Sequence, residues 1–333
     1  MITAYRSEAN RLVPLTETEI GGLIDGLPSD LVWFDIVSPT SDEDKLIEQL
    51  LSLSLPTREE MEEIEVSARL YQEDGAEFMT VTAVTRIETE APETSPITFI
   101  LKGNVLATIR FVEPRAFSTY IARAQKPGAV ACAGGEQIMF ALVESQCDRM
   151  ADALERVGRE LDKLSRKVFR REVGEKPSTS SDDLRAIIEK IGRDADLLTK
   201  VRESLVSINR LVTYHQTVDA KDKRQVKDAR AKAKVLYRDV VALTDQATFL
   251  STKLEFLLDA TLGLINIQQT QIIKIFSVAA VVFLPPTLIA SIYGMNFEYM
   301  PELQWTYGYL WALGIMVVSA ILPYVYFRIK GWL

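Results

Sequence analysis

The sequence predicts an α/β cytoplasmic domain, followed by a long helical stalk and two C-terminal transmembrane helices. Three observations support this fold class. Strand-like and helix-like patches alternate in residues 1–135, a helical pattern then runs for roughly 140 residues from Glu136, and the tail is apolar. The chain has 38 basic and 46 acidic residues, yet only four charged residues follow Lys274: Glu298, Glu302, Arg328 and Lys330. This distribution argues against a wholly soluble protein and against a transporter with many spans.

The first 135 residues hold 11 basic and 22 acidic residues and read as an α/β domain. Runs rich in β-branched and aromatic residues predict strands at 31–37, 77–85, 97–101 and 105–111. Helices are expected at 41–53 and 114–124, and Lys102-Gly103-Asn104 predicts a hairpin turn. Neither GxGxxG nor GxxxxGK occurs, and no catalytic triad or nucleophile elbow is recognisable. An enzyme or an organic cofactor is therefore not expected.

Residues 136–274 are expected to form a helical cytoplasmic region that ends in a stalk helix. Breaks are predicted near 174–181 and 219–223, and Thr179 and Ser180 each stand three residues before an Asp, as in a capping box. No strong breaker follows Asp222 until Pro285, which predicts a helix of about 60–70 residues, roughly 100 Å long. Either the stalk conveys a signal between domain and bilayer, or it is a plain coiled-coil spacer.

Two charge-free runs predict membrane spans. The first, residues 275–297, would be about 35 Å long as a helix, and the second covers residues 305–327 with aromatic residues near its start. Basic residues flank the pair at Lys274 and in the tail 328–333, whereas the connecting loop 298–304 is acidic. The positive-inside rule places both termini in the cytoplasm and the loop outside. The alternative is a helical hairpin buried in a large soluble core. No apolar run opens the chain, so no signal peptide is expected.

Two spans cannot enclose a hydrophilic path, so a pore requires several chains around an axis, and otherwise the hairpin only anchors the domain. One helical face of the stalk and first span mixes small polar with isolated large apolar residues: Asp259, Leu262, Asn266, Thr270, Ile273, Ser277, Ala280, Leu284, Thr287 and Ser291. Facing an axis, Asp259 would form a carboxylate ring at the inner mouth. Ile273 with Phe276, and Leu284, would form apolar constrictions that gate by dewetting. Alternatively, this stripe faces lipid or a neighbouring helix.

A motif follows the first span. Tyr293-Gly294-Met295-Asn296, followed by Met300-Pro301-Glu302-Leu303, resembles the signature of CorA-type magnesium channels. The segments Phe283–Asn296, Gly263–Gln269 and Tyr324–Leu333 are similar to the enterobacterial branch of that family. Upstream, Arg58–Arg69 is the best local match, and the order of parts agrees along the whole chain.

The resemblance implies a CorA-like, funnel-shaped homopentamer with pore-lining first spans and an outer ring of second spans in the cell inner (plasma) membrane. It implies influx of Mg²⁺, and commonly of Co²⁺ and Ni²⁺, through a selectivity filter at Gly294, Met295 and Asn296. It also implies closure by intracellular Mg²⁺ held between neighbouring cytoplasmic domains. Glu63 matches one regulatory position of the family, and Asp239 is a plausible partner.

Physical chemistry agrees with these assignments. Mg²⁺ dehydrates reluctantly, so a ring of amide and carbonyl oxygens suits it better than a tightly binding carboxylate ring. Glu298 and Glu302 would concentrate cations at the entrance, or else simply keep the loop soluble. Without an ATP motif, the driving force must be electrochemical.

Two other functions compete. A zinc transporter of the same superfamily commonly has another residue where Met295 stands, so Met295 favours the magnesium channel. A membrane-anchored sensor or scaffold without a pore is disfavoured by the polar stripe, since polar groups within a span are costly unless they face a cavity or a partner.

A net charge of −8 without a basic stripe argues against nucleic acid as a partner. One histidine and two cysteines without metal spacing argue against a His-rich metal site or a disulfide framework.

Overall fold

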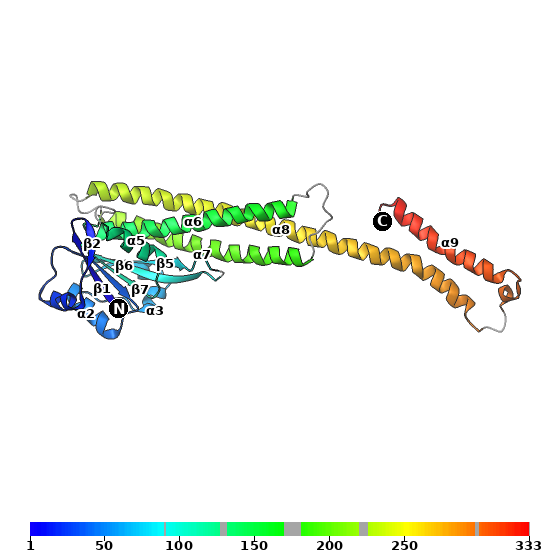
Figure 1. The fold of residues 1–333 in the computed structure, drawn as a ribbon, viewed down its shortest axis with the longest axis horizontal. Helices are drawn as coiled ribbons and strands as arrows, with labels where there is room; N and C mark the ends of the chain where they lie inside the picture. Colours follow the sequence, from blue (N-terminus) through cyan, green and yellow to red (C-terminus); the bar gives the residue numbers. More distant parts are fainter. Residues whose placement is uncertain (90, 127–131, 170–180, 220–225, 297–299, 333) are drawn as a thin grey trace. The chain divides into compact units, whose positions relative to one another are not determined.

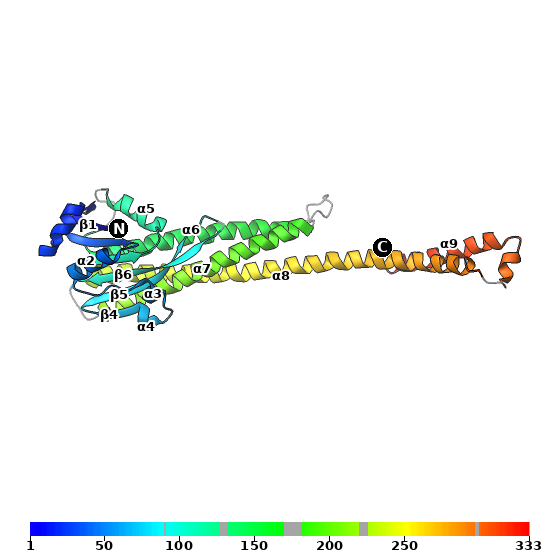
Figure 2. The same ribbon diagram turned by 90° about the horizontal axis from the view of Figure 1, so that it is seen from below.

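The computed structural model describes residues 1–89, 91–126, 132–169, 181–219, 226–296 and 300–332. These residues belong to two units (Figures 1 and 2). The first unit comprises residues 1–177 and 186–257, and the second comprises residues 178–185 and 258–333.

The first unit is built on one seven-stranded sheet of order β2-β1-β3-β7-β6-β5-β4. Its strands are β1 (Ile2–Glu8), β2 (Arg11–Pro14), β3 (Leu31–Val37), β4 (Leu70–Glu73), β5 (Ala76–Thr85), β6 (Glu93–Lys102) and β7 (Val105–Arg110). All neighbouring strands are antiparallel except β3 and β7, which pair in parallel.

All four predicted strands are confirmed, and the hairpin turn at Lys102-Gly103-Asn104 joins β6 to β7. Gly103 has φ of 61°, a left-handed conformation that glycine adopts without a Cβ penalty. β6 begins at Glu93, earlier than predicted, because its polar start continues the ladder with β5. The strands β1, β2 and β4 were not predicted, since they are short or lie toward the sheet edges, where polar residues are tolerated.

The described helices of the first unit before the stalk are α1 (Glu17–Gly21), η1 (Gly22–Asp25), α2 (Ser41–Leu51), α3 (Arg58–Glu62), α4 (Val66–Arg69), α5 (Arg115–Ala124) and α6 (Gly135–Phe169). The predicted helix at 41–53 begins with a capping box, in which Thr40 and Glu43 satisfy each other's backbone N–H groups. It ends at Leu51 because Ser52 turns left-handed, with φ of 50°. The helix predicted at 114–124 is confirmed as α5.

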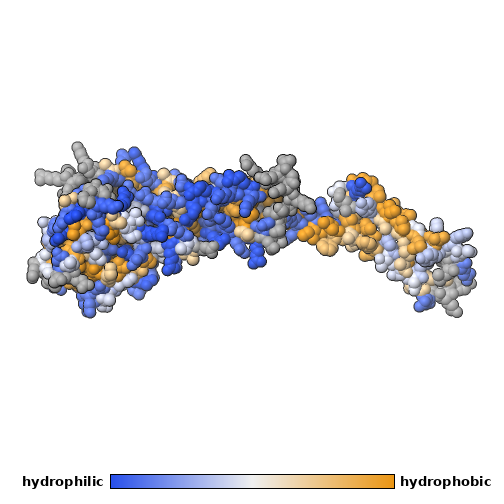
Figure 3. All heavy atoms as spheres, in the orientation of Figure 1, coloured by the Kyte–Doolittle hydropathy of each residue, from blue (hydrophilic) through white to orange (hydrophobic). Residues whose placement is uncertain are grey.

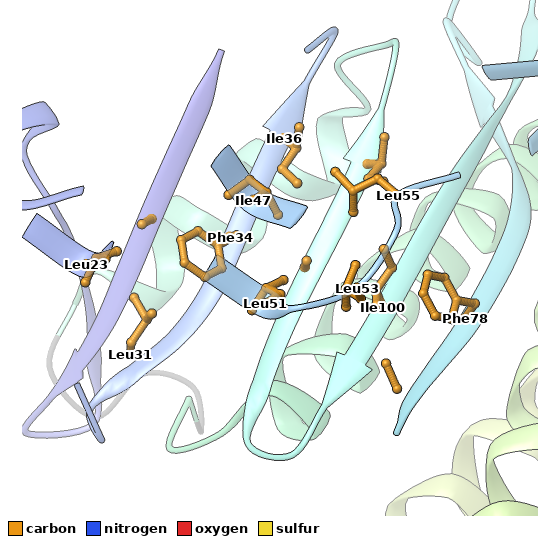
Figure 4. Close-up of a cluster of buried hydrophobic side chains, with 14 of the residues drawn as sticks. Leu23, Leu31, Phe34, Ile36, Ile47, Leu51, Leu53, Leu55, Phe78 and Ile100 are labelled. Carbon is orange, nitrogen blue, oxygen red and sulfur yellow. The ribbon is translucent and has the colours of Figure 1, made fainter. Parts of the chain in front are cut away.

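Strand alternation gives the sheet two buried faces. Phe34 and Ile36 of β3 point to one face, where they pack with Ile47 and Leu51 of α2 (Figure 4). Trp33, the residue before Phe34, points to the other face, where its ring lies 6.1–6.3 Å from those of Tyr120 and Phe117 of α5. The sheet therefore lies between the α1–α4 region and α5–α6, and both layers bury apolar area that stabilises the first unit.

Two further helices complete the long helical part, α7 (Ser181–Asp219) and α8 (Val226–Tyr293), followed by η2 (Pro301–Gln304) and α9 (Gly308–Ile329). Most of the two predicted breaks, including Thr179 and Ser180, lies outside the described residues. The long helix is confirmed, since α8 has 68 residues and contains Pro285 and Pro286. Figure 1 shows a bend in the orange part of α8, as expected where prolines remove backbone hydrogen bonds.

Candidate functional site

The Gly294-Met295-Asn296 triplet lies directly after the end of α8. The backbone N–H of Gly294 still donates to the Ala290 carbonyl at 2.9 Å, and that of Met295 donates to the Ile292 carbonyl at 3.3 Å. A Cβ at residue 294 would stand 3.1 Å from the Ala290 carbonyl oxygen, so only glycine fits without a shift. The triplet is exposed in the single chain. The triplet thus begins at the point where the chain leaves the helix.

A helix end of this kind favours cations. The last carbonyls of an α-helix lack intrahelical donors and carry the negative end of the helix dipole. The triplet follows directly after this end of α8, and the last turn of α8 contains no basic residue. The local field therefore attracts a cation without supplying a full carboxylate charge.

The predicted stripe is exposed along α8. All eight residues assigned to the pore and its gates are exposed: Asp259, Asn266, Thr270, Ile273, Phe276, Ser277, Leu284 and Thr287. The Thr270 hydroxyl donates to the Asn266 carbonyl at 2.8 Å, and the Thr287 hydroxyl donates to the Phe283 carbonyl at 2.8 Å. Because each hydroxyl proton is used within the helix, its oxygen lone pairs remain to accept hydrogen bonds from water around a cation.

A different face of α8 is turned toward α9. Lys274 lies with its ammonium 5.7 Å from the centre of the Trp332 ring, and Val278, one turn later, is 4% exposed. At 3.6 residues per turn, the stripe lies roughly a third of a turn around the helix from these two residues. The stripe is therefore left uncovered by the chain's own second span.

Apolar side chains dominate the surface of this hairpin. Two helices, α8 and α9, are long and apolar enough to cross a membrane. In Figure 3 orange residues cover much of the visible face of the hairpin, while paler residues gather at its loop end. Glu298 lies outside the described residues. Glu302 belongs to η2, and the structure describes only the backbone of this residue. Compared with the predicted spans, α8 ends earlier, at Tyr293, and α9 runs from Gly308 to Ile329.

The two predicted regulatory residues are exposed but do not meet within the chain. Glu63 caps the end of α3, and its carbonyl accepts a hydrogen bond from the Arg69 guanidinium. Asp239 lies on α8 near Asp148 of α6. Burial, followed by the charges of Asp152 and Asp239, raises the pKa of Asp148. Among the described residues no hydrogen bond or ion pair joins Glu63 to Asp239.

Asp148 and Asp152 are acidic residues that the sequence reasoning missed. Their spacing of four on one helix was visible, but their proximity to Asp239 depends on how α6 packs against α8. In the described part of the chain, no group of three or more His, Cys, Asp and Glu side chains has metal-binding geometry. Cys132 and Cys147 are both free and buried.

The histidine also belongs to a site that the sequence did not predict. His215 of α7 is buried, with Nδ1 2.8 Å from a Glu77 carboxylate oxygen and Nε2 3.0 Å from one of Glu136. Burial lowers the pKa of His215, but the hydrogen bonds and charges of Glu136 and Glu77 outweigh burial and raise it to about 9. Each ring nitrogen is engaged by a different carboxylate, so this cluster joins β5, α6 and α7 rather than forming a metal site.

Comparisons with known proteins agree over the whole chain. The family model described as CorA-like Mg²⁺ transporter protein matches residues 28–328. The magnesium transport protein CorA of Salmonella typhimurium is 37% identical and that of Escherichia coli is 36% identical, each with full coverage of both chains. The complete structure of the CorA magnesium transporter from Methanocaldococcus jannaschii has a TM-score of 0.76 at 23% identity, covering 100% of this chain and 99% of that one. The full-length CmaX protein has a TM-score of 0.69 at 14% identity, covering 99% and 97%. These two structural likenesses establish the fold.

Proposed function

The chain belongs to the CorA-like Mg²⁺ transporter family, and from this premise we propose that it forms a homopentameric channel for Mg²⁺ influx. The proposal includes passage of Co²⁺ and Ni²⁺, a filter at Gly294, Met295 and Asn296, and closure by intracellular Mg²⁺. The observation that carries it is the position of the triplet directly after the carboxyl end of α8, where the helix-end carbonyls carry partial negative charge.

Selectivity follows from the chemistry of that end. Mg²⁺ keeps most of its water, so the filter must recognise a hydrated ion by accepting hydrogen bonds from its water shell. The amide oxygen of Asn296 and the carbonyls of the last helical turn are such acceptors. Because they carry only partial charges, the ion binds well enough to enter and weakly enough to leave.

The oligomer follows from the uncovered stripe. Polar side chains of the stripe such as Ser277 and Thr287 lie within the apolar half of α8, and they are costly in lipid unless they face water or a partner. A single two-helix hairpin cannot surround a water path. Several copies around a closed axis would turn the stripe inward and leave α9 outside, toward lipid.

Gating is assigned to apolar rings along the same stripe. Ile273, Phe276 and Leu284 are 64%, 72% and 65% exposed in the single chain. Around an axis, such side chains would narrow the path and exclude water, which blocks a hydrated ion. Asp259 would form a carboxylate ring at the inner mouth, while Glu298 and Glu302 would attract cations at the outer one.

The proposed orientation places both termini in the cytoplasm of a cell whose inner membrane contains the hairpin. Lys274, Arg328 and Lys330 lie at one end of the two spans and the acidic loop at the other, as the positive-inside rule requires. An inside-negative potential of ~100 mV then supplies roughly 4.6 kcal/mol for a divalent ion, at ~2.3 kcal/mol per charge. This energy is sufficient for uptake without ATP.

The test is Mg²⁺ entry into proteoliposomes, reported by a trapped dye under an inside-negative potential. We expect electrogenic uptake that needs no pH gradient and falls at least tenfold in Asn296→Ala. Gln304→Ala, which removes an exposed amide just outside the triplet, serves as the matched control and should retain uptake. Zn²⁺ movement driven by a proton gradient, without Mg²⁺ entry, would instead establish a zinc transporter. Absence of flux for both ions would leave a membrane-anchored sensor.

A further inference from the structure

The end of α9 forms an ordered turn that returns the chain toward α8. Gly331 has φ of 69°, the N–H of Gly331 donates to the Arg328 carbonyl at 3.1 Å, and the N–H of Trp332 donates to the Phe327 carbonyl at 3.0 Å. This pair of bonds is a Schellman motif, which usually includes an apolar contact across the helix end. Here the Trp332 and Phe327 rings provide that contact, with centroids 5.3 Å apart.

The turn places an indole against a cation of the other helix. The Lys274 ammonium lies 5.7 Å from the centre of the Trp332 ring, within the range of a cation–π contact. Trp332 remains 46% exposed, so part of its side chain stays accessible. The preceding turn of α9 adds the exposed cations Arg328 and Lys330 at the same end of the hairpin.

In the part of the chain that the structure describes, these three cations have no acidic partner. Lys274, Arg328 and Lys330 form no ion pair among the described residues, unlike Lys253 earlier on α8, which pairs with Asp162. The only acidic residues after Asp259 are Glu298 and Glu302, which belong to the loop at the opposite end of the spans. Positive charge is thus left uncompensated where the apolar helices end.

We propose that Lys274, Arg328, Lys330 and Trp332 form a binding site for the headgroup phosphate of an anionic phospholipid. The cations match the charge of the phosphate, and the indole suits the boundary between headgroup and acyl chains. The fixed turn holds the indole and Lys274 together before the lipid arrives. The site rests on the proposed topology, because it takes its lipid from the cytoplasmic leaflet.

Native mass spectrometry of the full-length protein in detergent tests the site, with phosphatidylglycerol and phosphatidylcholine as probes. We expect phosphatidylglycerol to bind at least tenfold more tightly. Lys274→Gln and Arg328→Gln should each weaken its binding about fivefold, as expected for ~1 kcal/mol per cation at a membrane surface. Trp332→Ala should also weaken it, whereas Trp332→Tyr should retain most of it. Lys234→Gln, which removes an exposed cation from the cytoplasmic part of α8, is the control and should bind like the wild type.

Equal binding of the two lipids, or equal losses in Lys234→Gln and Lys274→Gln, would overturn the proposal. Displacement of phosphatidylglycerol by millimolar inorganic phosphate would also overturn it, because the site would then recognise free phosphate. The same spectra report the oligomer mass, so a misfolded variant is recognised directly. Failure of the channel proposal would appear separately, as absent Mg²⁺ flux in vesicles where lipid selectivity persists.

Discussion

At the scale of single residues, the His215 cluster gives a prediction about pH. The pKa of His215 is about 9 in the folded chain and about 6.5 when unfolded, so the folded state binds the proton more tightly. Its stabilisation is complete below pH 6.5 and is lost as pH rises toward 9. At full strength it is roughly 3 kcal/mol, from ~1.36 kcal/mol per pKa unit. We expect His215→Gln to lower the unfolding midpoint at pH 6.5 and to differ much less from the wild type at pH 9.5.

Thermal unfolding of the full-length protein in detergent, followed by circular dichroism, checks this pH dependence. Thr213→Val serves as a control, because Thr213 is exposed on the same helix and its hydroxyl bonds only within that helix. A gap between wild type and His215→Gln that stays constant across this pH range would show that His215 is not protonated in the folded state.

The same residue shows a limit of prediction from sequence. His215 is separated by 138 and 79 positions from its partners Glu77 and Glu136, and no local pattern joins them. The triplet at Gly294–Asn296, in contrast, can be picked out in the sequence, because it stands at the end of an apolar run. Its role in selectivity stays a prediction, as do the roles of the pore, gate and regulatory residues.

At the scale of elements, α8 provides a matched pair of isoleucines. Ile273 lies on the predicted pore stripe, and Ile275 lies on nearly the opposite side of the helix, about 200° further around. Both are 64% exposed. Replacing Ile273 by Ser would admit water to an apolar constriction, so we expect several-fold faster Mg²⁺ leak from vesicles held at high internal Mg²⁺. Ile275→Ser should leave the leak unchanged, and a faster leak in Ile275→Ser alone would reassign the pore face.

Element prediction from sequence succeeded where one signal was strong. The long helix, the two spans and four strands were visible, because apolar periodicity or β-branched runs dominate them. The strands β1, β2 and β4 were missed, since polar residues such as Arg6, Glu8 and Gln72 interrupt their patterns and pairing with neighbours decides their structure. Helix ends were also displaced, as at Ser52, because a left-handed residue terminates α2 without a glycine to announce it.

At the scale of the whole molecule, Mg²⁺ is expected to bind between neighbouring subunits and to protect the assembled channel. Glu63 and Asp239 are exposed, and among the described residues no hydrogen bond or ion pair joins them, so we expect a metal ion that uses both to link two copies. We expect such an ion to bind only the closed assembly and so to shift the population toward it. At ten times its Kd it contributes about 1.4 kcal/mol, which reduces the open population roughly tenfold.

Limited proteolysis of the full-length protein in detergent measures that population, because cleavage follows the opened state when opening and closing are fast. We expect millimolar Mg²⁺ to slow cleavage about tenfold in the wild type and to have little effect in Glu63→Ala or Asp239→Ala. Glu62→Ala removes the neighbouring carboxylate, which pairs with Arg58 within the helix, and should keep the protection. Full protection in both Glu63→Ala and Asp239→Ala would move the regulatory ion elsewhere, with the acidic group of Asp148 and Asp152 on α6 as the next place to test.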